Sequence, residues 1–135
     1  MVLTMVGGAR CALPVRSVVE TMPALPIEPI GDMSSSVLGL AIVRGEPIVV
    51  LDAGALLTGS RRGGTRFVIL RAGDRRIALL VEAVLDVRAI DPALLTGLPP
   101  LLGKGPALAI GALDAALVVV LDAARMVPAD VWDKL

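Results

Sequence analysis

Short aliphatic runs, each broken by glycine or proline after about the length of one β-strand, constrain this chain more than any other feature. The 135 residues include 14 Gly and 10 Pro. Turn residues recur roughly every 8–12 residues, a spacing typical of an all-β sandwich or barrel. The two richest runs, "IALLVEAVLDV" and "AALVVVLDAARMV", contain Glu82, Asp86 and Asp122, so neither reaches the roughly 20 apolar residues of a membrane-spanning helix.

The pattern predicts eight or nine short strands. We expect single strands over 2–6, 10–15, 37–43 and 47–52. Two more flank a turn at 72–74, with a third or a continuation through 87, and the last two form a hairpin over 107–122. Short helical turns are expected at 15–22, where valines recur at helical spacing, at 53–59, at 92–96, and from 123 until Pro128 ends the last one. We find no tandem repeat, and the length fits one domain over 1–135.

Charge and composition narrow the class of protein. Lys and Arg number 13, as do Asp and Glu, so no net charge draws the chain to nucleic acid or to an anionic membrane. Hydrophobic residues make up 56%, with only one Phe and one Trp. The core must therefore be aliphatic, and the surplus predicts an exposed apolar patch of the kind that binds protein partners.

The residues of most catalytic and metal sites are missing. The chain has no histidine, and Cys11 is its only cysteine, so a Ser–His or Cys–His dyad and a structural zinc site are excluded. No glycine-rich phosphate-binding motif occurs, and the carboxylates are not spaced as a catalytic pair. We expect a binding module with no catalytic residue, metal, cofactor or small-molecule ligand. No secretion signal is recognised, which predicts the cytoplasm.

Three phrases, in order, resemble the CheW-like family of bacterial chemotaxis coupling proteins. They are "CALPVRSVVETM", "VLGLAIVRGEPIVVLDAGALL" and "RFVILRAGDRRIALLVEAVLDV". The Arg-Gly pair in the second phrase, followed by Asp52, is the most specific element. The segment 31–36 and the proline at position 47 depart from the family pattern.

The resemblance implies an all-β fold of two intertwined five-stranded SH3-like barrels with short helical turns. It also implies a non-catalytic adaptor that joins the cytoplasmic tip of a chemoreceptor to the regulatory domain of a histidine kinase, in a two-component system. A CheW-like adaptor of a different phosphorelay is the alternative, and a small β-barrel enzyme is a third, disfavoured by the lack of histidine.

The resemblance places partner-binding residues at Arg44, Gly45, Val18 and Glu20, near a groove between the barrels where the receptor tip docks. Each has a plain structural alternative. Arg44 precedes Gly45 at a hairpin turn and can be a solvated turn charge, Val18 can be a core residue, and Glu20 can be a solvated or capping charge. We expect Asp52 to be a structural helix N-cap.

Overall fold

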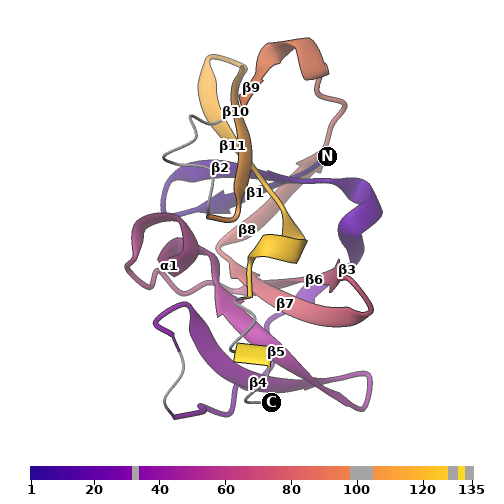
Figure 1. Ribbon diagram of the computed structural model, residues 1–135, viewed down its shortest axis with the longest axis vertical. Coiled ribbons are helices and arrows are strands. Elements are labelled where there is room, and N and C mark those ends of the chain that lie inside the picture. The colour runs from indigo at the N-terminus through magenta and orange to yellow at the C-terminus, as the bar shows by residue number, and fades with distance from the viewer. Residues whose placement is uncertain (32–33, 98–104, 128–130, 133–135) are drawn as a thin grey trace.

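The computed structural model describes residues 1–31, 34–97, 105–127 and 131–132. Within them, eleven strands form two sheets, one of six strands and one of five (Figure 1). The strands are β1 (Val2–Val6), β2 (Ala9–Leu13), β3 (Val18–Pro23), β4 (Val37–Val43), β5 (Glu46–Asp52), β6 (Arg66–Ala72), β7 (Arg75–Val81), β8 (Ala83–Val87), β9 (Leu95–Gly97), β10 (Ala107–Leu113) and β11 (Ala116–Leu121).

In the described residues, helical structure is limited to short turns. The α-helix α1 spans Ala53–Thr58, and single 3-10 turns lie at Val15–Ser17, Pro92–Leu94 and Ala123–Arg125. Asp52 is the N-cap of α1, as expected, because its carboxylate accepts the Ala55 N–H at 2.9 Å. The stop expected at Pro128 lies outside the described residues.

One local prediction is wrong. Of the helical turns expected over 15–22, only a single 3-10 turn at Val15–Ser17 is present, and Val18–Pro23 form the strand β3 instead. Strand β3 pairs with β6 along its length, and β-branched valines are stiff side chains that favour a pleated sheet. Strands β3 and β9 account for the difference between the expected nine strands and the observed eleven.

The two sheets form the first barrel and the second barrel. The first barrel has the strand order β8-β1-β2-β11-β10-β9, and the second has the order β3-β6-β7-β5-β4. Strands β3–β7 are thus inserted between the two chain segments that build the first barrel (Figure 1). The predicted all-β fold of two intertwined barrels is confirmed, with β9 as a sixth strand in the first.

The two barrels repeat one topology, although the sequence shows no tandem repeat. In β8-β1-β2-β11-β10 and in β3-β6-β7-β5-β4, the successive pairings are antiparallel, antiparallel, parallel and antiparallel. The β4–β5 ladder shifts register between Val37 and Gly39, and the β10–β11 ladder shifts between Ala107 and Ala109. Ala107 and Ala109 lie 70 residues after Val37 and Gly39, respectively.

The same offset is visible in the sequence once the structure has indicated it. When 37–56 is aligned with 107–126 without gaps, identical residues are Leu38 and Leu108, followed by the run "VVLDA" at 49–53 and at 119–123. Each half of the chain gives its first two strands to one barrel and later strands to the other. This exchange is what intertwines the barrels.

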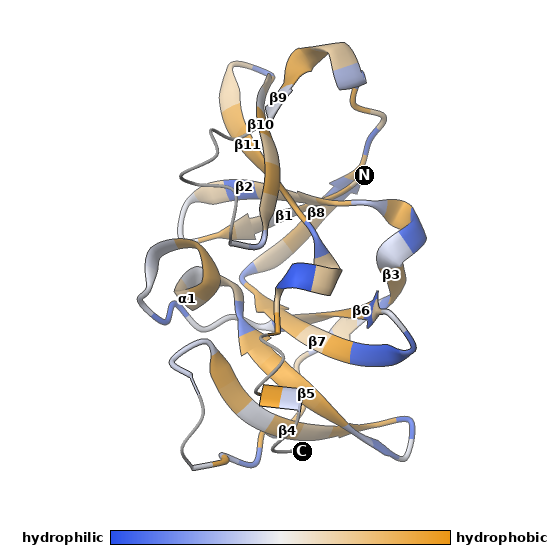
Figure 2. Ribbon diagram, viewed as in Figure 1, coloured by the Kyte–Doolittle hydropathy of each residue, from blue (hydrophilic) through white to orange (hydrophobic). Residues whose placement is uncertain are grey.

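Three apolar clusters hold the fold together. One lies between the barrels and combines Val2, Cys11 and Leu13 of the first with residues such as Leu70 and Leu79 of the second. The second barrel has its own interior cluster around Phe67, and the first has a smaller one around Leu3 and Val120. Figure 2 shows β5 and β7 coloured as hydrophobic over most of their length.

Candidate partner-binding site

Arg44 lies at the tip of the β4–β5 hairpin in a strained backbone conformation. Its φ is +53° and that of Gly45 is +80°, so both central residues of the turn are left-handed, as two-residue hairpins with a type I′ turn require. Glycine adopts such a φ at no cost, whereas arginine rarely does. The turn fixes the position of the Arg44 backbone and leaves its side chain 71% exposed.

Arg44 forms a bidentate ion pair with Glu20, which belongs to β3. Its Nε lies 3.2 Å from Glu20 Oε2, and its Nη2 lies 2.8 Å from Glu20 Oε1. The hydrogen bond from Arg44 has the largest effect on the pKa of Glu20 and lowers it below its ordinary value. Desolvation opposes this shift, and the charges of Arg44 and Arg76 lower the pKa further. The same hydrogen bond raises the pKa of Arg44. Both groups are therefore charged at neutral pH.

This ion pair joins the two edges of the second barrel. Strands β3 and β4 are the outermost strands of the five-stranded sheet, so Arg44 and Glu20 meet only because the sheet curls on itself. A second edge contact supports the closure, since Glu28 and Leu40 exchange two backbone hydrogen bonds of 2.7 and 2.9 Å. Gly39 allows this approach, because a Cβ there would lie 2.0 Å from the carbonyl oxygen of Glu28.

Val18 lies on the opposite face of β3 from Glu20. It is paired with Leu70 and packs against the cluster between the barrels, whereas Glu20 is paired with Ile69 of the second barrel's interior. The ladder shifts register between Val18 and Glu20. The structure thus brings Arg44, Gly45 and Glu20 together and places Val18, which is half-buried, on the other side of the strand.

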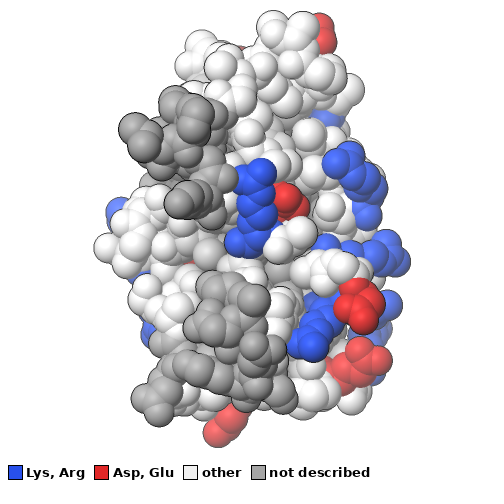
Figure 3. All heavy atoms as spheres, in the orientation of Figure 1, with Lys and Arg blue, Asp and Glu red and all other residues white. Residues whose placement is uncertain are grey.

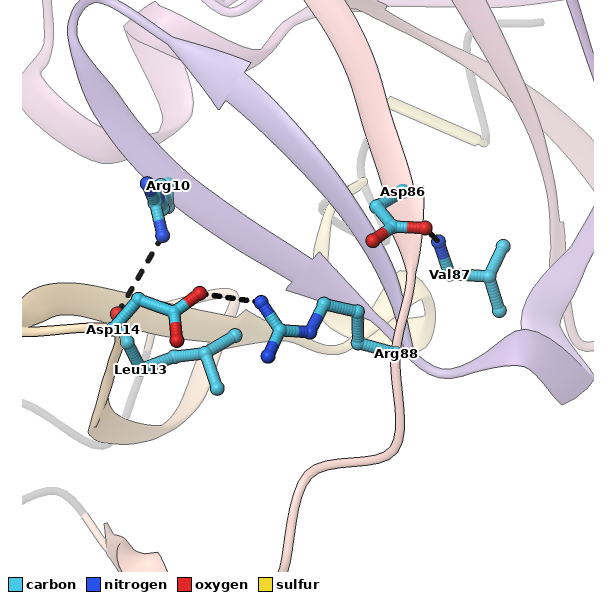
Figure 4. A network of polar contacts seen from close by, with 6 residues as sticks. All are labelled: Arg10, Asp86, Val87, Arg88, Leu113 and Asp114. Carbon is cyan, nitrogen blue, oxygen red and sulfur yellow. Dashed lines mark hydrogen bonds and ion pairs between the residues drawn. The ribbon is translucent and has the colours of Figure 1, made fainter.

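A second ion pair occupies the corresponding place in the first barrel. Asp114 and Ala115 form the β10–β11 turn with φ values of +51° and +61°, and the Asp114 carboxylate accepts a hydrogen bond from Arg88, just after β8 (Figure 4). The hydrogen bond from Arg88 lowers the pKa of Asp114. Sequence reasoning missed this pair. In the alignment at an offset of 70 residues, Asp114 is the residue equivalent to Arg44.

An apolar hollow of about 370 Å³ lies beside α1, between the β1–β2 turn and the β10–β11 hairpin. Its lining includes Val6, Leu56, Leu57, Ile110 and Val119, with Arg62 among them. None of the four residues singled out from the sequence lines it. Large apolar side chains are also exposed elsewhere, namely Val15, Ile42, Leu85, Val87, Leu94 and Leu117.

Buried polar and titratable side chains in the described residues have structural roles. The buried polar side chains are those of Thr4 and Asp52, and both are hydrogen-bonded to backbone groups. Burial raises the pKa of the Cys11 thiol to about 12, so it is not a nucleophile at neutral pH. No cluster of three His, Cys, Asp or Glu side chains suited to a metal occurs among the described residues, and no helix there is long and apolar enough to cross a membrane.

The chain is a small domain of two intertwined β-barrels. Its surface carries charged hairpin tips and the apolar hollow beside α1. The family model described as the CheW-like domain matches residues 1–131. The chain is therefore a member of the CheW-like family, as its three sequence phrases predicted.

A solved structure agrees with this assignment. The crystal structure of the scaffolding protein TtCheW from Thermoanaerobacter tengcongensis is similar, with a TM-score of 0.79 and 21% sequence identity over 90% of this chain and 86% of that chain. At this level of identity the likeness supports the fold. No curated protein sequence compared with this chain matches it.

Proposed function

We propose that this chain is a non-catalytic adaptor that couples the cytoplasmic tip of a chemoreceptor to the regulatory domain of a histidine kinase in chemotaxis signal transduction, and that it acts in the cytoplasm as one domain. Membership of the CheW-like family supports this proposal. The observation that carries it is the exposed Arg44–Glu20 ion pair on a conformationally fixed hairpin tip. Gly45 completes the turn, and Val18 is proposed as an apolar partner contact on the other face of β3.

The geometry of the pair favours recognition over stability. An exposed ion pair adds little to the stability of a fold. A guanidinium has five N–H donors, and Glu20 accepts from only two of the Arg44 nitrogens. The remaining donors lie on a side chain that is 71% exposed, where they can meet a carboxylate of a partner helix and fix its register.

The test is a calorimetric titration of the full chain with two probes, a receptor-tip fragment and a kinase regulatory domain from the same organism. We expect both to bind, with a negative heat-capacity change that marks an apolar interface. Arg44→Glu is expected to weaken binding of the receptor-tip fragment at least tenfold, because like charges then face each other across the contact. The thermal midpoint should stay close to that of the wild type.

A matched control is Arg66→Glu, which makes the same change in net charge. Arg66 is the first residue of β6 and is paired with Pro23 rather than with Glu20, so this variant should leave binding unchanged. If Arg44→Glu unfolds the protein, Arg44 is a structural residue and its assignment to the binding site is wrong. If the wild-type chain binds neither probe, the adaptor function itself is wrong.

A further inference from the structure

Two arginines face each other directly across the β6–β7 hairpin. Arg71 and Arg76 are Cα partners in the antiparallel ladder, and both are exposed. Like charges at directly opposite positions destabilise a pair of strands. Within the described part of the chain neither guanidinium has a hydrogen bond or a salt bridge. The carboxylate of Glu20 attracts Arg76 without forming an ion pair with it, so no direct contact in that part neutralises the pair.

Both arginines belong to the face of the hairpin that lines the second barrel. Phe67 and Ile69 precede Arg71 on that face of β6, and Ala78 and Leu80 follow Arg76 on that face of β7, all four being members of the interior cluster. This places the two arginines at the end of the barrel where Glu20, the Cα partner of Ile69, stands. The charge of Arg76 contributes to the lowered pKa of Glu20, which agrees with this proximity.

The third arginine of the hairpin differs from the other two. Arg75 is paired with Ala72 on the opposite face, and its guanidinium lies 4.6 Å from the centre of the Trp132 ring. It therefore has a cation–π partner within the chain. Figure 3 shows basic side chains gathered along this side of the molecule, over the ends of the β6–β7 and β4–β5 hairpins, with acidic side chains among them.

We propose that Arg71 and Arg76 form a docking point for a carboxylate-bearing segment of the protein partner that binds at the Arg44 end of the second barrel. This inference rests on the proposed adaptor function. Paired guanidinium groups bind carboxylates through short, charge-assisted hydrogen bonds, and a bound carboxylate removes the repulsion between the two arginines. Glu46 lines one surface hollow together with Arg76, and Glu20 lies near Arg76. These carboxylates would repel the continuous negative charge of a nucleic acid, which favours a protein segment.

The test compares three charge reversals in the full chain, Arg71→Glu, Arg76→Glu and Arg75→Glu, by titration with the same receptor-tip and kinase-domain fragments and by thermal denaturation. Arg71→Glu and Arg76→Glu each replace a like-charge pair by an opposite-charge pair. We expect each to raise the thermal midpoint and to weaken binding of the receptor-tip fragment about tenfold, as expected for the loss of a charge-assisted hydrogen bond. Arg75→Glu makes the same change in net charge on the other face and should change binding less than about twofold.

Higher stability together with weaker binding would support the docking point, because a purely structural residue does not change the two in opposite directions. An equal loss of binding in Arg75→Glu would reduce the effect to overall charge and overturn the inference. If Arg44→Glu weakens binding while Arg71→Glu and Arg76→Glu do not, the docking point is wrong and the adaptor function stands. If the wild-type chain binds neither fragment, the adaptor function is wrong and the docking point fails with it.

Discussion

The two barrels share one topology but differ in how deeply their strands are buried. In the second barrel, consecutive residues of β6 and β7 are buried on both faces, because one face lines the barrel and the other packs against the first barrel. In the first barrel the equivalent strands β1 and β2 are also largely buried. The barrels differ at β10, which is half-buried or exposed along its length, whereas its counterpart β4 is buried at alternate positions. Repeating a topology therefore does not repeat its energetics, and we expect the second barrel to be the more stable part of the fold.

The same contrast appears at two aspartates in equivalent positions. Asp52 and Asp122 each follow a "VVL" run and cap a helical turn. Asp52 is fully buried and also accepts the N–H groups of Arg62 and Gly63, at 3.1 and 2.9 Å. Asp122 is half-exposed, accepts only the N–H of Ala124 among the described backbone groups, and lies near Arg125.

The two ion pairs at the hairpin tips have their positive and negative partners in reversed positions. In the second barrel the turn carries the arginine and the edge strand β3 carries the carboxylate, whereas in the first barrel the turn carries Asp114 and Arg88 follows the edge strand β8. The two ends thus offer opposite charges from the same backbone position. Such a difference can give two partners distinct binding sites on one repeated fold.

The largest expected effect is that of Gly39→Ala in the second barrel. The new methyl group would lie 2.0 Å from the Glu28 carbonyl oxygen, at a residue whose φ is +149°. We expect the free energy of unfolding to fall by about 3 kcal/mol or more, measured by denaturant titration.

The equivalent residue of the first barrel, Ala109, already carries a methyl group, so Ala109→Gly is the matched control and should cost only about 1 kcal/mol. Equal losses from the two substitutions would show that the close contact at Gly39 adds no cost beyond that of the backbone change.

The next effect is that of Asp52→Ala compared with Asp122→Ala. Loss of the Asp52 carboxylate leaves several N–H groups without an acceptor in the interior, and we expect a cost of about 2–3 kcal/mol. Asp122→Ala should cost about 1 kcal/mol or less, because water can replace its single backbone contact. Denaturant titration of both variants measures the difference, and a larger loss for Asp122→Ala would contradict the comparison.

The smallest effect is the pH dependence of the Glu20 ion pair. Because the folded-state pKa of Glu20 is lowered from its ordinary value of 4.5, its contribution to stability is present above that value and is lost as the pH falls through the folded-state pKa. The difference in thermal midpoint between the wild type and Glu20→Gln should therefore be small at pH 7 and vanish in acid. A difference that grows on acidification would contradict this sign. Asp114→Asn should behave in the same way in the first barrel.

Most strands could be predicted from the sequence because their signals are local. Strands β4 to β7 follow from aliphatic runs that end at a turn residue such as Gly45 or Gly73. The strand β3 could not be predicted, because Val15, Val18 and Val19 also fit a helical spacing, and only pairing with β6 decides between the two. Strand β9 is three residues long and carries too weak a pattern.

The candidate site was predicted in part. The resemblance indicated Arg44, Gly45 and Glu20 as separate residues, and their assignment to partner binding stays a prediction. Their contact across 24 positions of sequence depends on closure of the barrel. Arg76 carried no signal in the sequence, since only the register of β6 and β7 places it beside Arg71 and near Glu20.

By itself, the sequence determined an aliphatic all-β chain without histidine, its hairpin turns and its membership of the CheW-like family. The tertiary structure decided how the strands are shared between the barrels, which of two equivalent aspartates is buried, and which charges meet at the barrel ends. The physical reason is the sequence distance over which each interaction acts. Turn preference and the alternation of apolar residues act between neighbours in the chain, whereas burial and ion pairing depend on strands that meet only after both sheets have curled and packed together.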